Sequence, residues 1–121
     1  MPSTKNRGIE FTLPFPPSVN NWLRIMRGRA VKSKEYRAWQ EGAGMVVSTL
    51  YAGELVNTPG VEVTIWLDPP NRRRFDIDNR VKPILDAMEG YIYTNDYYVD
   101  KLTVYRGRLV TGGQARVFVE W

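Results

Sequence analysis

Two aspartates spaced by one residue form the part of the sequence with the clearest chemical character. The stretch RRRFDIDNRVKPILDAMEG, residues 72–90, places Asp76 and Asp78 directly after three arginines. In an extended segment successive side chains point to opposite sides. Both carboxylates would then face one point in space, while Phe75 and Ile77 anchor the segment on the other side.

Three further side chains extend this group. Lys82 and Asp86 follow Asp78 at intervals of four, which is the spacing of one face of a regular helix. Asp96 lies in the polar and aromatic loop YTNDYYVD, and loops beside a rigid scaffold often supply ligands to a site.

Three carboxylates brought together, Asp76, Asp78 and Asp96, would repel one another unless a cation neutralised them. Mg²⁺, with Mn²⁺ as a substitute, suits such oxygen ligands and binds through carboxylates together with substrate phosphate. The ion can activate a water molecule and stabilise charge on a cleaved phosphodiester, and Lys82 would add positive charge at the transition state. The pattern therefore favours metal-dependent phosphodiester cleavage.

Each of these residues also has a purely structural interpretation. Asp78 could cap the N-terminus of a helix, and Lys82 and Asp86 could form a solvated pair of little energetic value. Asp96 could be a turn residue, and the arginines at 72–74 could belong to an ordinary polar loop. The spacing alone gives only a weak preference for a metal site.

The composition excludes several classes of enzyme. The 121 residues include no cysteine and no histidine, which rules out disulfides, thiolate zinc sites, cysteine nucleophiles, serine–histidine triads and histidine-bound metals. The net charge is +4, yet residues 76–100 hold six acids against two bases. An acidic centre within a basic surround suits a metal-dependent enzyme that acts on a polyanion.

The length and composition predict one compact domain that spans residues 1–121, since a chain this short rarely forms two cores. No apolar run reaches membrane-spanning length, and the first ten residues, MPSTKNRGIE, lack the apolar stretch of a secretory signal. We therefore expect a cytoplasmic protein without membrane contact.

Hydrophobic periodicity predicts an α+β fold with the element order β-α-β-α-β-β. The expected architecture is a two-layer sandwich in which a mixed four-stranded sheet carries two α-helices on one face. The last two strands flank TGGQ and are predicted to pair as an antiparallel hairpin. The expected strands are residues 8–13, 60–67, 100–110 and 115–121, and the helices run from Ser33 to about Tyr51 and from the region of Arg80 to Gly90.

Pro83 complicates the start of the second helix, because it lacks an N–H group and disfavours helical geometry at Lys82. Either the regular helix begins near Arg80 or its first turn is irregular. In both cases we expect Lys82 near the aspartates at the start of the helix.

The sequence resembles the RusA family of Holliday junction resolvases, which are small dimeric endodeoxyribonucleases common in phages and prophages. The resemblance covers nearly the whole chain. Its specific stretches are FTLPFPPSVNNWLR, residues 11–24, the central residues 72–90 and YTNDYYVDKL, residues 93–102. The combination of these stretches is far more specific than a bare pair of aspartates.

The resemblance implies that Asp76, Asp78 and Asp96 are essential metal ligands and that Lys82 is the catalytic lysine. It also implies that Asn79 and Asp86 support the active-site motif, and that a homodimer presents two sites to opposing strands of a junction. One departure is visible at Asn95, where the family usually has the first of two aspartates. The ligand role is therefore carried over to Asp96.

Basic residues are expected to form the DNA-binding surface. We expect the arginines of the central motif to contact the DNA backbone, and Trp22 either to stack on a base or to pack in the core or the dimer interface. The expected DNA-binding residues are Arg72, Arg73, Arg74, Arg24, Arg27, Arg29 and Lys32.

The leading interpretation is a Mg²⁺-dependent endodeoxyribonuclease that resolves four-way junctions by symmetric paired nicking in DNA recombination and repair, in a bacterial or phage-infected cell. One alternative is a noncatalytic module that binds branched nucleic acid. Another is a metal-dependent nuclease that prefers flaps or replication forks. Binding without cleavage would indicate the module, and cleavage without junction preference would indicate the other nuclease.

Overall fold

The computed structural model describes residues 5–19, 23–26 and 28–121, with only the backbone described at 23–26 and 29–31. Most of the chain forms strands and helices. In chain order these are β1 (Gly8–Pro14), β2 (Leu23–Met26), β3 (Arg29–Lys32), α1 (Lys34–Leu50), β4 (Val61–Asp68), α2 (Val81–Met88), β5 (Val99–Arg106) and β6 (Gln114–Glu120). Two 3₁₀ turns, Ile77–Arg80 and Asp96–Tyr98, precede α2 and β5.

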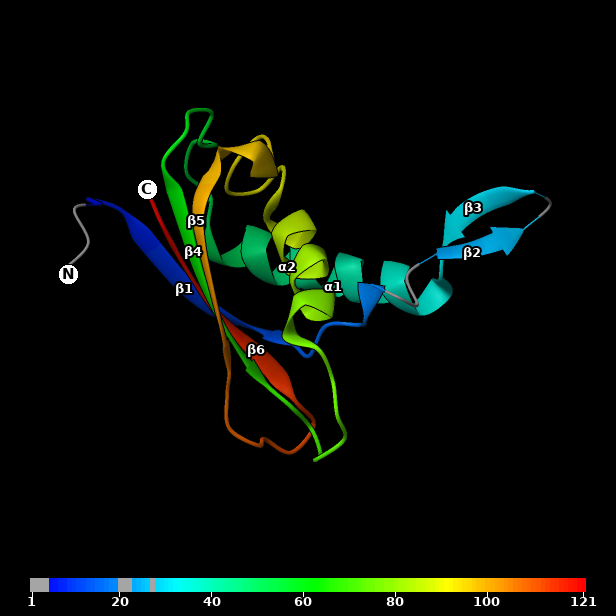
Figure 1. The fold of residues 1–121 in the computed structure, drawn as a ribbon. Coiled ribbons are helices and arrows are strands. Elements are labelled where there is room, and N and C mark those ends of the chain that lie inside the picture. The colour runs from blue at the N-terminus through cyan, green and yellow to red at the C-terminus, as the bar shows by residue number, and fades with distance from the viewer. Residues whose placement is uncertain (1–4, 20–22, 27) are drawn as a thin grey trace.

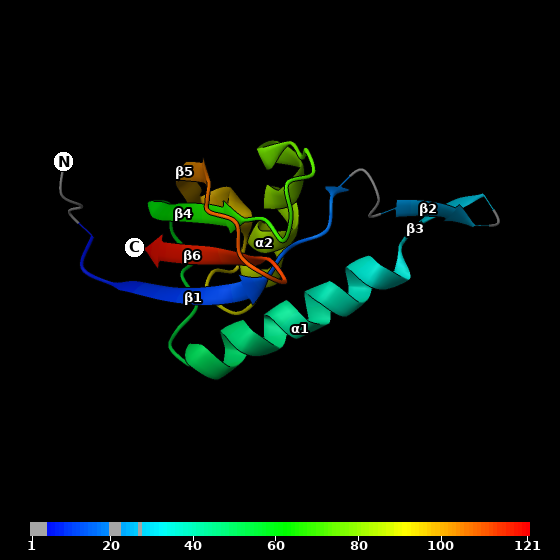
Figure 2. The same ribbon diagram turned by 90° about the horizontal axis from the view of Figure 1, so that it is seen from below.

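A four-stranded sheet in the order β1-β6-β4-β5 forms one layer of the fold. β4 and β5 run parallel, and the other pairs are antiparallel, so the sheet is mixed. Both helices lie on the same face of this sheet (Figures 1 and 2). The predicted α+β sandwich is therefore confirmed.

The predicted C-terminal hairpin is wrong. β6 pairs with β1 and β4, and β4 in turn separates β6 from β5. The TGGQ stretch does reverse the chain, because Gly112 and Gly113 adopt positive φ angles. A turn signal does not determine which strands pair, and the strictly alternating apolar residues of β6 occupy a central position instead.

The structure contains one hairpin, within the described residues, that was not predicted. β2 and β3 pair with each other in a separate two-stranded sheet, and this ribbon projects beyond the first turn of α1 (Figures 1 and 2).

Local signals explain the boundaries of α1. The Ser33 side chain accepts a hydrogen bond from the backbone N–H of Tyr36 at 3.2 Å, and Tyr51 forms the C-terminal cap. Both ends match the prediction. β4 confirms the strand predicted at residues 60–67, and its alternate residues Val61, Val63 and Ile65 are buried.

The core lies between the sheet and the two helices. It combines inward residues of β1, β4 and β6 with Val47 of α1 and Ile84 and Met88 of α2. This packing fixes α2 against the sheet and so positions its polar face. Among the described residues, no helix has the length and apolar character needed to cross a membrane.

Candidate active site

The sequence left open whether the second helix begins near Arg80 or has an irregular first turn, and the start of α2 combines the two. The chain forms a 3₁₀ turn over Ile77–Arg80 and continues directly as an α-helix from Val81. Pro83 is the third residue of that helix, where the backbone N–H would have no partner within the helix. The helix therefore accepts Pro83 without losing an internal hydrogen bond, and Lys82 can belong to its first turn.

Lys82 lies between two carboxylates. Its Nζ is 2.9 Å from Asp86 Oδ1 and 2.8 Å from Asp96 Oδ2. The Lys82 side chain is 46% exposed, whereas Asp86 and Asp96 are 15% and 24% exposed, so the ammonium group remains open to a ligand. The hydrogen bond to Asp96 raises the pKa of Lys82 above its ordinary value despite partial burial. Lys82 is therefore a stable positive charge rather than a proton acceptor.

Tyr36 supports this group from α1. Its side chain is fully buried, and its hydroxyl donates a hydrogen bond to Asp86 Oδ2 at 3.3 Å. Burial, followed by the negative charge of Asp86, raises the pKa of Tyr36 to about 12, so the hydroxyl stays protonated near neutral pH. Asp86 is thus held on one oxygen by Tyr36 and on the other by Lys82.

Three acids come close enough together to hold a cation. Oxygen atoms of Asp86, Glu89 and Asp96 lie within 4.8 Å of one another. Hard cations such as Mg²⁺ bind carboxylate oxygens, so the donor set fits such an ion. Lys82 already contacts two of the three acids, and an ion at that position would compete with its ammonium group.

Asp76 and Asp78 lie outside this cluster. Both are exposed, and Asp76 Oδ2 accepts a weak hydrogen bond of 3.5 Å from Asn79 Nδ2. The predicted extended geometry holds at Asp76 but not at Asp78, because the 3₁₀ turn already begins at Ile77. The expected anchoring does occur, since Phe75 and Ile77 pack against the core.

Of the three expected ligands, only Asp96 therefore belongs to a compact acidic group within the part of the chain that the structure describes. The assignment of Asp76, Asp78 and Asp96 as a set remains a prediction.

The expected DNA-binding residues divide into three groups. Arg72, Arg73 and Arg74 are exposed beside the turn, and the last two line a cavity. The Lys32 ammonium donates to Gln40 at 3.2 Å and lies 5.4 Å from the centre of the Tyr36 ring. Trp22 and Arg27 lie outside the described residues. The side chains of Arg24 and Arg29 lie outside the described part as well.

A family model described as Endodeoxyribonuclease RusA matches residues 14–120, which include every acid of the site. The chain belongs to the RusA family of endodeoxyribonucleases. The resemblance seen in the sequence is confirmed, and the enzyme class follows from the family.

Bacterial and phage proteins are among the curated relatives of this RusA-family chain. Each has the name crossover junction endodeoxyribonuclease RusA. The protein of Escherichia coli strain K12 is 33% identical over 102 residues, which cover 79% of this chain and 84% of the relative. The protein of Enterobacteria phage 82 has the same values. That of Enterobacteria phage HK97 is 26% identical over 106 residues, covering 87% and 88%.

Sequence reasoning missed two members of this RusA-family site. Glu89 follows Asp86 by three residues, so helical spacing alone could have placed both on one face. Tyr36 lies within the predicted helix, and only the packing of α1 on α2 brings it to Asp86, 50 residues away. No local pattern identifies that contact.

Proposed function

We propose that the protein is a Mg²⁺-dependent endodeoxyribonuclease that resolves four-way DNA junctions by paired nicks. The observation that carries this proposal is the contact of Lys82 with Asp86, both on α2, and with Asp96 of the 3₁₀ turn before β5, in a chain of the RusA family. The names of the curated relatives support a crossover junction as the substrate.

We assign Asp76, Asp78 and Asp96 as the ligands of the cation, with Mn²⁺ as a substitute for Mg²⁺. Asp76 and Asp78 are exposed, and Asp96 is partly exposed, so each of the three carboxylates is accessible to a cation from solvent. When bound, the ion supplies an activated water and stabilises negative charge on the phosphate. The residues of the chain supply the remaining functions.

Lys82 holds its proton and presents a positive charge to the phosphate, where it stabilises the charge that develops during cleavage. Asp86, fixed by Tyr36, positions the Lys82 ammonium group. Asn79 contacts Asp76 and limits its orientation. These assignments give Lys82, Asp86 and Asn79 distinct tasks beside the three proposed ligands.

The biological unit in this proposal is a homodimer, because two symmetric cuts require two active sites. The exposed arginines at 72–74 would contact the DNA backbone beside each site. The proposed role is junction processing in DNA recombination and repair.

The experiment compares cleavage of a labelled four-way junction in Mg²⁺, in Mn²⁺ and in EDTA. The proposal predicts cleavage with either cation and none in EDTA. Junction binding without cleavage in all three conditions would support the noncatalytic module instead. Cleavage that persists in EDTA would contradict the assignment of a cation.

A further inference from the structure

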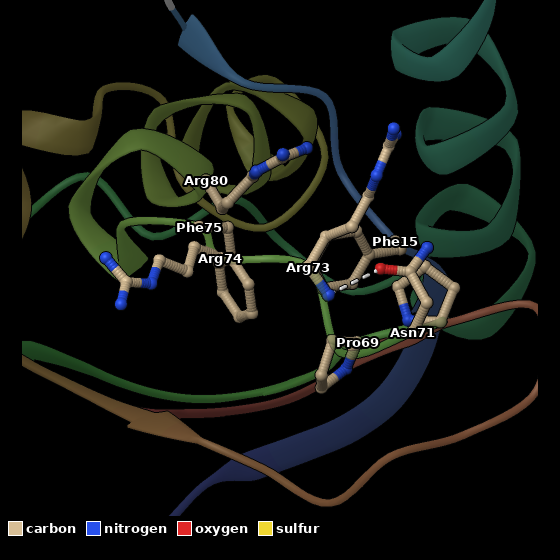
Figure 3. Close-up of a pocket in the computed structure, with 8 residues that line it drawn as sticks. Phe15, Pro69, Asn71, Arg73, Arg74, Phe75 and Arg80 are labelled. Atoms are coloured by element: carbon tan, nitrogen blue, oxygen red, sulfur yellow. Dashed lines mark hydrogen bonds between the residues drawn. The ribbon is translucent and has the colours of Figure 1, made fainter.

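A basic and aromatic cavity of about 560 Å³ lies beside the turn that carries Asp78. Three separate segments form it: the loop after β1, the loop after β4 and the chain leading into α2 (Figure 3). Its lining includes two phenylalanines, three arginines and an asparagine, namely Phe15, Phe75, Arg73, Arg74, Arg80 and Asn71. The proposed cleavage chemistry uses none of these six side chains.

The cavity is suited to an anion. No acidic residue lines it, and none of Arg73, Arg74 and Arg80 forms an ion pair within the described residues. In Figure 3 the Arg73 side chain extends toward the top of the view and the Arg74 side chain toward the left. The Arg80 guanidinium is fixed by a 2.7 Å hydrogen bond from Nη1 to the Pro16 carbonyl. Three guanidinium groups therefore border the cavity, and none of them has a counterion in the part of the chain that the structure describes.

The cavity is also suited to a planar ring. Phe15 and Phe75 meet edge to face, with ring centres 5.4 Å apart. Both rings are only partly buried, and the Arg106 guanidinium lies 4.3 Å from the centre of the Phe75 ring. Arg80 lies 5.2 Å from the centre of the Phe15 ring, and guanidinium groups as well as aromatic rings stack on nucleobases. The arginines, which can bind a phosphate, thus lie next to the two aromatic rings, which can contact a base.

The position of the cavity connects it to the proposed active site. Phe75 immediately precedes Asp76, and Arg80 lies two residues after Asp78 and two before Lys82. Adjacent Cα atoms are about 3.8 Å apart, so these positions lie within the span of a nucleotide or two. The cavity and the expected ligands Asp76 and Asp78 therefore border the same short segment of chain.

We propose that this cavity binds one unpaired nucleotide of a DNA strand at a branch point, with the phosphate at the arginines and the base against Phe15 and Phe75. This inference rests on the proposed function. Taking a base out of the stack costs least where pairing is already broken, as it can be at a branch point. The cavity would thereby favour branched DNA over continuous duplex.

The test measures the affinity of Phe15→Leu for a labelled four-way junction and for a linear duplex of the same sequence, by fluorescence anisotropy in EDTA. Leucine keeps apolar bulk but removes the ring, so junction affinity should fall about tenfold. Duplex affinity should stay unchanged. The matched control is Phe118→Leu, because Phe118 belongs to neither the core cluster nor the cavity.

Circular-dichroism melting checks the fold of each variant, and Phe75→Leu provides the same comparison if Phe15→Leu is unfolded. Unchanged junction affinity would overturn the inference. So would an equal loss for junction and duplex, because it would indicate contact with the backbone alone. Cleavage of the junction by the unaltered protein in Mg²⁺ is a separate readout, and its absence would contradict the proposed function rather than the cavity.

Discussion

At the scale of single residues, the surroundings of Lys82 limit its chemical role. Two carboxylates within hydrogen-bond distance raise its pKa, so the side chain keeps its proton across the neutral range. A permanently charged lysine stabilises negative charge but does not take a proton from water. Water activation must therefore come from a carboxylate or a bound cation, which is why the acids are central to the proposal.

The first prediction concerns Asp78. Asp78→Asn should abolish cleavage while DNA binding in EDTA is kept or strengthened, because the change removes a ligand and also a negative charge near phosphate. Junction cleavage and junction affinity measure the two effects. Asp100→Asn, an exposed acid in β5, is the matched control and should cut normally. Wild-type cleavage by Asp78→Asn would show that the site is assigned wrongly.

The second prediction concerns Tyr36. Tyr36→Phe keeps the buried ring but removes the hydrogen bond to Asp86. A hydrogen bond to a charged group contributes about 1.5–3 kcal/mol, so the cleavage rate at saturating DNA should fall about tenfold. Junction affinity in EDTA should not change, because Tyr36 would act through Asp86 rather than on DNA.

The matched control for this change is Tyr97→Phe, since the Tyr97 side chain is 77% exposed. A parallel loss of affinity and rate in Tyr36→Phe would indicate a general structural role instead.

At the scale of secondary-structure elements, Asp68 ties together the end of β4, the start of β6 and the segment after β5. Its carboxylate is fully buried and accepts hydrogen bonds from Arg116 at 2.7 and 3.1 Å and from Gln114 at 2.8 Å. The backbone N–H of Arg108 donates a further bond of 3.1 Å. Burial opposes ionisation, but these bonds hold the pKa of Asp68 below its ordinary value.

The third prediction follows from this arrangement. Asp68→Asn should lower the free energy of unfolding by about 1.5–3 kcal/mol at pH 7, because asparagine cannot accept the same charged bonds. A depressed pKa stabilises the fold above the ordinary carboxyl pKa, and this contribution is lost as the pH falls through the folded value. The difference between wild type and variant should therefore shrink below about pH 4.

Urea unfolding of the wild type and of Asp68→Asn, at pH 7 and below about pH 4, measures the difference in the free energy of unfolding. A difference that does not depend on pH would indicate lost packing rather than lost charge.

Local patterns predicted those elements that depend on nearby residues. The Ser33 cap and the alternation of β4 required no knowledge of distant contacts, and the i, i+4 spacing correctly placed Lys82 beside Asp86. Strand pairing was different. A turn at TGGQ suggested a hairpin, but the neighbours of β6 depend on burial across the whole sheet. Tyr36 was missed for the same reason, because its contact depends on helix packing.

At the scale of the whole molecule, a net charge of +4 coexists with a local group of acids. The fourth prediction is that DNA affinity falls steeply between low and physiological salt, because phosphate contacts release counterions. Arg72→Gln should reduce the slope of log affinity against log salt by about one. Arg37→Gln, an exposed change on α1, should leave the slope unaltered. An affinity independent of salt would exclude the arginine surface as the contact.

The central claim is that two copies of this site cut opposing strands of a four-way junction. The most direct measurement maps the cuts on each strand of a labelled junction and of a matched duplex, in Mg²⁺ on a denaturing gel. The proposal predicts paired nicks at symmetrically related positions in the junction and none in the duplex. Equal cutting of both substrates, or cuts confined to one strand of the junction, would contradict it.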